Sequence, residues 1–442
     1  MNYQELIKRA LDEGFTDIEI YSQHQKGLSI SVFDGAIDKN TMNNTISYSI
    51  RGIYNDKMAY VTSEDPNEDI DFIIQKLKEN AKVLTTDEEF EIFAGSRDYK
   101  VIEKEYSDFY LINPKVKVDM LKKLESLVKQ KDPRIVFVPY CRYSEVDVTT
   151  EIVNSKGLNL SNTNRFAFIM VGAVSREGTD QKSAYEIKAV NKFEDFNIEE
   201  LAEKVVKRSV SLLGAEPVES KFYPVIFENE AMTEILGAFQ SMFSGESAIR
   251  KTTLLLGKEN EKIMSEKITI VDDPFHKDAI IVSPFDDEGV ACYEKDVVSN
   301  GVFKTFLHNL KTARYFKTTS TGNGFKAGIS SYAGVRGANL IIKPGTTSLE
   351  EMIQDTKEGL LITDVAGLHS GSDPASGNFS IQSTGYLINN GKIVRPVNLI
   401  VVSGNFLKMM NDVEVVGSDL DVSYRGVGAP SIKFTSLSVS GK

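Results

Sequence analysis

Glycine is distributed unevenly along this 442-residue chain, and the imbalance divides the chain into two parts. Residues 1–215 hold 9 of the 31 glycines, and residues 216–442 hold the other 22. Glycine-rich sequence with short apolar runs is typical of β-structure with tight connections. A chain of this length also exceeds the roughly 250–300 residues at which one core stops growing. We therefore predict an N-terminal domain over 1–215, a β-rich domain over 216–442, and a boundary near 214–220.

The N-terminal part begins with a first series of elements, over residues 1–90. A helical pattern covers residues 2–13, and four alternating stretches follow, DIEIYSQ, LSISVFDG, TISYSIRGIY and MAYVTS. The pair Asp65-Pro66 is expected to open a second helix, since proline is favoured at the first helical position. The order is thus helix, four strands, helix.

A second series, over residues 113–215, has the same order. A helix is expected from Asn113-Pro114, four strand-like runs follow, and Asn197 is expected to cap a closing helix. Because the order repeats, we predict an internal duplication of an α-β4-α unit.

The C-terminal part is predicted to consist mostly of strands and turns, with one main helix over 230–243. Three Asn-Gly or Asp-Gly pairs lie between alternating apolar runs and predict two-residue hairpins: Asp34-Gly35, Asn300-Gly301 and Asn390-Gly391. The predicted fold class is α+β, with the duplicated unit followed by a β-rich, barrel-like domain.

Charge and cysteine content restrict the partners and the compartment. The 51 basic and 63 acidic residues give a net charge of −12. A net-acidic chain is not drawn to phosphate backbones, so we expect no direct nucleic-acid partner. No window approaches the roughly 20 apolar residues of a membrane span, so we expect no membrane partner. The two cysteines, Cys141 and Cys292, cannot form a disulfide framework, which favours the cytoplasm.

The residues offer little for a metal site. The motifs HExxH, HExxxH and CxxC are absent, and no two of the four histidines lie within one helical turn. Cys292 and His308 are interpreted as a buried thiol and a surface imidazole. The acidic runs 272–273 and 286–289 contain possible oxygen ligands, but their neighbours Pro274 and Gly289 favour ordinary turn chemistry. We therefore predict no metal in this chain.

The segment GLHSGSDPASGNFSIQSTGYL, residues 367–387, is the most informative polar stretch. A Ser/His/Asp nucleophile system is formally available there, although turns favour the same residue types. Backbone amides beside glycine can pair with an extended peptide, and asparagine amides can hold its register. The candidate peptide-binding residues, with two from a later Gly-Asn pair, are His369, Ser370, Gly371, Asn378, Phe379, Ser380, Gly404 and Asn405.

Five segments occur in an order that resembles a known family: ITIVDDPF, SPFDDEGV, TSTGNG, GLHSGSDPASGNFSIQSTGYLINNGKIVRPV and VSGNFLKMMNDVEVVGSDL. Together they resemble the C-terminal half of the TldD/PmbA family, also called modulators of DNA gyrase. The stretch from residue 14 to about residue 84 resembles the family's N-terminal domain.

The family has two branches, and the resemblance is closer to one of them. The TldD branch carries HExxxH on a helix and a late cysteine, and it is a zinc metallopeptidase. Here the matching helix, residues 229–245, reads NEAMTEILGAFQSMFSG, and the closing segment DVSYRGVGAPSIKFTSLSVSGK has no cysteine. The chain therefore resembles the metal-free PmbA/TldE branch.

The resemblance implies a TldD–TldE heterodimer that cleaves small unfolded peptides. This chain is expected to close the chamber and hold the substrate as an added strand, with zinc only in a TldD-like partner. Two alternatives remain open: a homodimeric protein that binds peptides without cutting them, and a hydrolase with its own site in residues 367–380.

Overall fold

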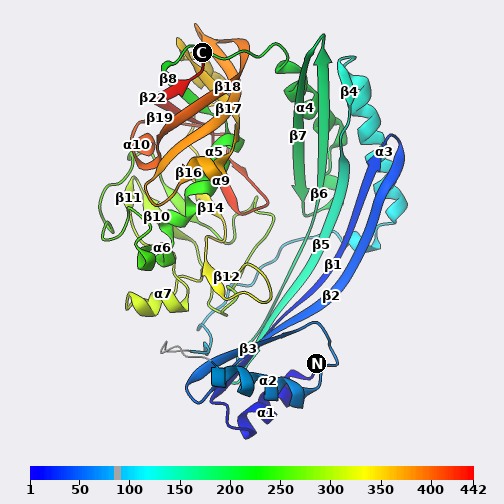
Figure 1. Cartoon of the computed structure of the whole chain (residues 1–442), viewed down its shortest axis with the longest axis vertical. Coiled ribbons are helices and arrows are strands. Elements are labelled where there is room, and N and C mark those ends of the chain that lie inside the picture. The colour runs from blue at the N-terminus through cyan, green and yellow to red at the C-terminus, as the bar shows by residue number, and fades with distance from the viewer. Residues whose placement is uncertain (84–90) are drawn as a thin grey trace.

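The computed structural model describes residues 1–83 and 91–442 of the chain (Figure 1). One sheet dominates the N-terminal part, in the order β3-β2-β1-β5-β6, with β7 and the short β4 both pairing with β6. Its strands are β1 (Asp17–Phe33), β2 (Ala36–Tyr54), β3 (Lys57–Ser63), β4 (Ile135–Phe137), β5 (Cys141–Asn154), β6 (Asn159–Glu177) and β7 (Asp180–Val190).

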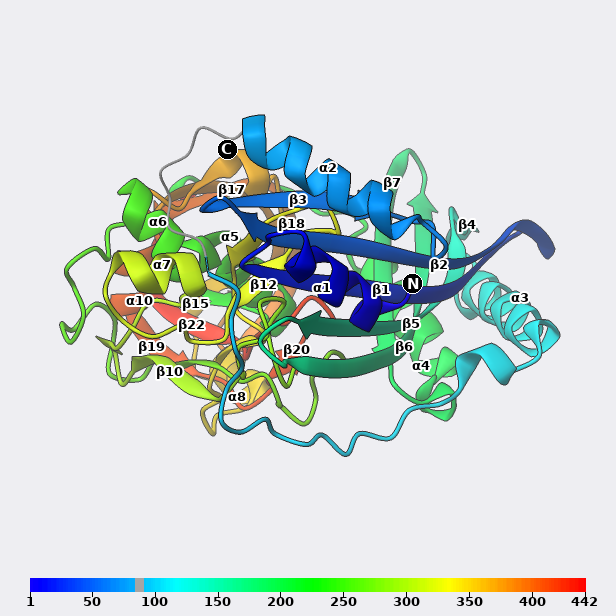
Figure 2. The same ribbon diagram turned by 90° about the horizontal axis from the view of Figure 1, so that it is seen from below.

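The two predicted series lie side by side in this sheet, and their origin by duplication stays a prediction. The central pair β1–β5 is antiparallel, with β2 and β3 beyond β1 and with β6 and β7 beyond β5. Each half has two helices: α1 (Tyr3–Asp12) and α2 (Ile70–Val83) in the first, and α3 (Pro114–Lys131) and α4 (Ile198–Ser211) in the second. Figure 2 shows α1 and α2 lying across strands β1 to β3. The two series are thus arranged as the two halves of one sheet.

The first half has three long strands where four stretches were expected. The expected stretches 17–23 and 28–35 are joined in β1, because Lys26 and Gly27 pair with β2 on one side and β5 on the other. A polar, glycine-containing segment resembles a break in sequence, but ladders on both sides keep it in the strand.

The predicted helix starts are correct for the second half and wrong for α2. Asn113 and Asn197 cap α3 and α4 by accepting hydrogen bonds from backbone amides. Helix α2 begins at Ile70 because Asp65 accepts from the amide of Asn67 in a turn, and Asp69 caps the helix instead. The end of the expected first series, residues 84–90, lies outside the described residues.

Five strands of the C-terminal part form a closed ring, as the barrel-like prediction expected. The ring runs β15-β8-β22-β18-β17 and closes through antiparallel pairing of β17 with β15. Its strands are β8 (Lys221–Phe227), β15 (Glu358–Ala366), β17 (Asn378–Asn389), β18 (Lys392–Asn405) and β22 (Ile432–Ser440). The main helix, α5 (Asn229–Phe239), packs against β15 and β8 with its apolar face in the core.

A smaller sheet extends this core, in the order β11-β10-β9-β14-β21-β20. Its strands are β9 (Ile270–Asp272), β10 (Lys295–Ser299), β11 (Val302–Phe303), β14 (Leu340–Ile342), β20 (Asp421–Val422) and β21 (Val427–Ala429). The other short elements are α6 (Gly245–Arg250), α7 (Leu310–Tyr315), α8 (Leu349–Gln354), α9 (Leu368–Gly371), α10 (Phe406–Asn411), β12 (Gly324–Lys326), β13 (Ala333–Val335), β16 (Ser372–Asp373) and β19 (Val413–Val416).

All three predicted hairpin turns are confirmed. Each connects two paired antiparallel strands, and both residues of each pair have positive φ, as a type I′ turn requires. Among the helices in residues 1–83 and 91–442, none is long and apolar enough to cross a membrane.

Candidate functional site

A cleft of about 1480 Å³ separates the N-terminal sheet from the barrel. One wall is β7, which Figure 1 shows on the side of the sheet that faces the barrel. The opposite wall consists of the first half of α5, the segment 363–365 of β15 and the residues around β20. Arg208 of α4 and Leu212, the residue after this helix, also line the cleft. The cleft is large enough for a peptide segment.

Strand β7 is an edge strand, and its free edge can be oriented from the hydrogen bonds. Within the described part of the chain, it pairs only with β6. Gly172 of β6 donates its amide to the carbonyl of Tyr140, away from β7, and Gly172 lies opposite Tyr185. Gly172 and Tyr185 are therefore a non-hydrogen-bonded pair of the antiparallel ladder. In such a pair the backbone N–H and C=O groups of the two residues point away from each other. Five residues of β7 therefore direct their backbone N–H and C=O groups to the free edge: Gln181, Ser183, Tyr185, Ile187 and Ala189.

Arg208 joins the two walls of the cleft. Its guanidinium lies 2.9 Å from Glu186 of β7 and 2.8 Å from Glu230 of α5. Burial raises the pKa of Glu186 to about 7 against the opposing effect of Arg208, and burial likewise raises the pKa of Glu228 to about 7. The junction is thus a partly buried ionic network that spans both parts of the chain.

The start of α5 is the segment that resembles the HExxxH helix of the TldD branch, and its donors do not fit zinc. Asn229 and Glu234 stand at the two histidine positions, and Glu230 stands at the glutamate position. The amide nitrogen of Asn229 donates to the carbonyl of Asp419 at 2.8 Å, and Glu230 is paired with Arg208. In the described residues no group of three or more His, Cys, Asp or Glu side chains is placed to hold a metal ion.

The predicted peptide-binding residues lie away from this cleft. They surround α9 and the adjoining ends of β17 and β18, and none of them lines the cleft. Asn405 donates to the carbonyl of Ser376 and to the side chain of Asn378, at 2.9 and 3.0 Å. Gly371 approaches the backbone of Ser380 so closely that an added Cβ would lie 2.4 Å from its carbonyl oxygen. The structure therefore brings these segments together as one compact loop cluster.

Phe379 corrects one expectation for this cluster. Its ring is 4% exposed and packs edge-to-face against Phe239, the last residue of α5. It belongs to the core because alternate residues of β17 point into the barrel. The side chain is therefore not available to a peptide.

The formal Ser/His/Asp system is not assembled. His369 is exposed, and in the described residues its side chain makes no hydrogen bond. The hydroxyl of Ser370 donates to the carbonyl of Gly367, and that of Ser376 donates to Asp373. These hydroxyls are used in turn formation.

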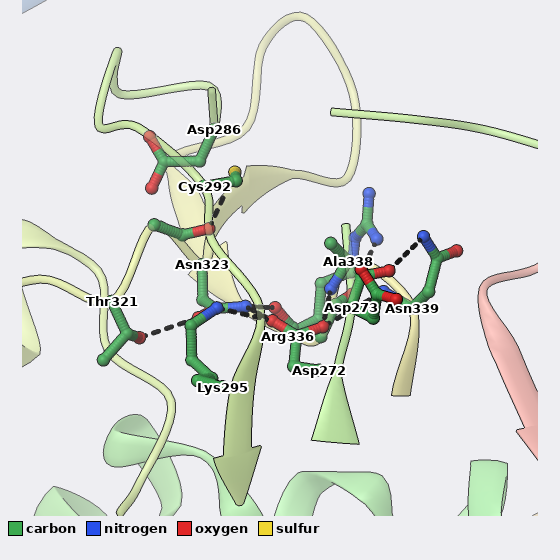
Figure 3. A network of polar contacts seen from close by, with 12 residues as sticks. Asp272, Asp273, Asp286, Cys292, Lys295, Thr321, Asn323, Arg336, Ala338 and Asn339 are labelled. Carbon is green, nitrogen blue, oxygen red and sulfur yellow. Dashed lines mark hydrogen bonds and ion pairs between the residues drawn. The ribbon is translucent and has the colours of Figure 1, made fainter. Parts of the chain in front are cut away.

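The acidic runs considered as metal ligands belong to a buried polar network (Figure 3). Asp272 accepts hydrogen bonds from Lys295 and Asn323, and from two backbone amides of residues 338 and 339. Asp286 accepts from three backbone amides, those of residues 288, 290 and 324. Protein donors thus satisfy both carboxylates. Their role in turns and in the core accounts for these acidic residues, which is the interpretation that the neighbouring Pro274 and Gly289 favoured.

Cys292 and His308 do not contact each other. The thiol is buried and donates to the carbonyl of Gly322 at 3.1 Å, as a buried thiol was expected to do. The interpretation of His308 as a surface group is wrong, because it is 5% exposed and lies beside Thr312. Burial lowers the pKa of His308 to about 4.

The sequence did not single out the residues of the cleft. Charged residues such as Arg208 and Glu186 resemble solvated helix and strand positions, and no local signal shows which strand ends a sheet. The sequence feature that came nearest to the cleft was the segment NEAMTE, which was compared with the HExxxH motif and forms the start of α5.

Comparisons with known proteins agree with the sequence resemblance. Three domain models match successive parts of the chain: PmbA/TldA metallopeptidase domain 1 at residues 18–81, the central domain at 108–213 and the C-terminal domain at 220–441. The chain belongs to the PmbA/TldD family.

Solved structures of this family superpose over nearly the whole chain. A modulator of DNA gyrase from Thermotoga maritima has a TM-score of 0.92 at 31% identity, and TldE from Thermococcus kodakarensis has 0.90 at 25%. Both alignments cover 99% of each chain. The metalloprotease PmbA homolog of Buchnera aphidicola is 31% identical over 241 residues, which is 54% of this chain and 51% of that protein. This alignment spans only about half of the curated relative.

Proposed function

We propose that this chain is the TldE/PmbA-like subunit of a TldD/TldE-type peptidase acting on small unfolded peptides in the cytoplasm. In this proposal it closes the chamber and holds the peptide, while a TldD-like partner carries the zinc. The observation that supports the proposal best is the cleft walled by the free edge of β7. The whole-chain similarity to a protein titled TldE agrees with this branch.

An extended peptide can be held at β7 by strand addition. Alternate residues of β7 present outward amides and carbonyls, and an added strand pairs with such groups at the same two-residue spacing. Backbone pairing is insensitive to the peptide's sequence, and it requires the peptide to be unfolded. The proposed substrate class is therefore small unfolded peptides.

The residues of this chain supply binding in the proposal and not the chemical step. The position equivalent to the catalytic glutamate, Glu230, is neutralised by Arg208 at 2.8 Å, and no histidine lies on α5. We propose that cleavage requires residues of the partner.

A single substitution on β7 tests the binding mode. Ser183→Pro removes one outward amide and leaves the ladder to β6 intact, because the backbone groups of Ser183 point away from β6. Ser183→Ala is the matched control, since it removes the hydroxyl and keeps the amide. Loss of one hydrogen bond of about 0.5–1.5 kcal/mol weakens peptide binding up to roughly tenfold.

The measurement uses unstructured synthetic peptides, with the chain alone and with an HExxxH-bearing partner from the same genome. The expected result is binding by the chain alone, cleavage only in the mixture, and weakening of both by the proline. Peptide binding without any partner-dependent cleavage would favour a homodimeric binding protein. Cleavage by the chain alone in the presence of a strong chelator would favour an independent hydrolase.

A further inference from the structure

The barrel side of the cleft carries three carboxylates that make no short ion pair in the described part of the chain. In the described residues, no ion pair is made by Glu234 of α5, Asp364 of β15 or Asp421 of β20, and all three line the cleft. Arg208 makes its short contacts to Glu186 and Glu230 and acts on Asp364 only at longer range. Lys188 likewise acts on Asp421, and Arg425 on Glu234, without a direct ion pair. These three carboxylates, called the acidic wall below, therefore face the cleft without a directly paired cation among the described residues.

The acidic wall is desolvated as well as crowded. Burial against the cleft walls raises the pKa of Asp364, Arg208 opposes the rise, and Glu230 and Glu234 add to it. Burial also raises the pKa of Asp421, with Glu230 contributing. Both side chains nevertheless remain open to the cleft. A positive group placed there gains more than it would at a fully hydrated surface.

Two buried polar atoms beside the acidic wall lack partners. Thr233, the neighbour of Glu234, is 8% exposed and lines the cleft, and its hydroxyl has no hydrogen-bond partner among the described residues. The side-chain oxygen of Asn398, on β18, also lines the cleft and is likewise unpartnered there. Such orphaned groups are rare in proteins and indicate a missing partner.

The barrel strands are irregular next to the acidic wall. The β15–β17 ladder shifts register between Ile362 and Asp364, and the β17–β18 ladder shifts between Ser383 and Gly385. Leu399, next to Asn398, has a φ of 52° and is 68% exposed. Bulges and strained residues re-aim side chains and are concentrated at binding sites.

We infer that the acidic wall, with Thr233 and Asn398, is a subsite for a positively charged organic group of the bound peptide, a lysine side chain or its N-terminal ammonium. An ammonium carries three donors, which suit carboxylates and the unpartnered oxygens of Thr233 and Asn398. The carboxylates are too dispersed to form a metal cluster in the described residues. This inference rests on the proposed function, since it names the chemistry of the peptide held in the cleft.

The test compares three short extended peptides on the full chain, all amidated at the C-terminus. The first has an acetylated N-terminus and one lysine, the second has norleucine in place of lysine, and the third has norleucine and a free N-terminus. A hydrogen-bonded charge adds about 1.5–3 kcal/mol, so the lysine peptide, the free-amine peptide or both are expected to bind at least roughly tenfold tighter than the neutral one. Whichever peptide gains affinity identifies the source of the charge.

The double variant Glu234→Gln/Asp364→Asn is expected to abolish this difference and leave binding of the neutral peptide unchanged. Glu266→Gln is the control for net charge, because Glu266 is exposed and lies outside the cleft. Equal affinities for all three peptides would overturn the cationic subsite while leaving peptide binding in place. Absence of binding by any peptide would overturn the proposed function itself. Tight binding of Ca²⁺ or Zn²⁺ alone, lost in the double variant, would overturn an organic cation as the ligand.

Discussion

Tyr21 of β1 donates a 2.9 Å hydrogen bond to Asp287, which lies 266 residues later in the chain. Asp287 also accepts the backbone amide of Lys326, and Tyr99 donates to the neighbouring carbonyl of Gly289. The Tyr21 bond attaches the N-terminal sheet to the C-terminal part, and the Tyr99 bond attaches the segment that follows α2 to the same turn. This attachment is separate from the Arg208 network, because neither Tyr21 nor Asp287 lines the cleft.

Tyr21→Phe tests this attachment. The half-buried Asp287 loses a donor, so the free energy of unfolding is expected to fall by about 1–3 kcal/mol in urea denaturation. Tyr110→Phe is the control, because Tyr110 is 58% exposed. Equal stability of the two variants would contradict an energetic role for the bond.

Closure of the barrel depends on close backbone approach at Gly385. A Cβ at this position would lie 1.9 Å from the carbonyl oxygen of Leu361 on the paired strand β15. Gly385→Ala is therefore expected to destabilise the chain by about 1–3 kcal/mol or more. Gly237→Ala on α5 meets no atom within 4 Å and is expected to stabilise the chain by about 0.5–1 kcal/mol. Thermal unfolding of the pair measures the contrast, and shifts in the same direction would refute it.

The junction at Glu186 is expected to make stability depend on pH. Because burial raises its folded-state pKa from 4.5 to about 7, its contribution is complete below pH 4.5 and is lost as the pH rises through 7. Relative to Glu186→Gln, the wild-type protein is expected to lose about 2–4 kcal/mol over this window. Urea denaturation at several pH values measures the difference, and a constant difference would argue against a shifted pKa.

The loop cluster is tested by His369→Ala/Asn378→Ala. If the loop captures peptide, binding is expected to weaken up to roughly tenfold while the melting temperature barely changes, because both side chains are exposed. Phe379→Ala is the matched control, since loss of this core ring is expected to cost about 3–5 kcal/mol. A double variant that loses stability but binds peptide normally per folded molecule would identify a purely structural turn.

Metal content provides a direct test of the branch assignment. The donors at the start of α5 are an amide engaged with Asp419 and a carboxylate paired with Arg208, neither of which is free for zinc. The purified chain is expected to contain no stoichiometric zinc by elemental analysis after dialysis. One tightly held zinc per chain would contradict the assignment to the metal-free branch.

The sequence by itself determined the features whose energetics are local. Asn113 and Asn197 cap their helices through amides two or three residues away, and the turn at Asn390-Gly391 needs only two residues able to adopt positive φ. The order of elements also predicted the barrel-like part.

Only the tertiary structure decided which polar groups are buried and which strand edge is open. Phe379 and His308 lie in the core because elements distant in sequence cover them. Strand β7 lines a cleft because, in the described part of the chain, it pairs with β6 on one side and with no strand on the other. Arg208 and Glu230 belong to different parts of the chain and meet only when the sheet and the barrel pack together. Burial and long-range pairing depend on residues far apart in sequence, so no local pattern can specify them.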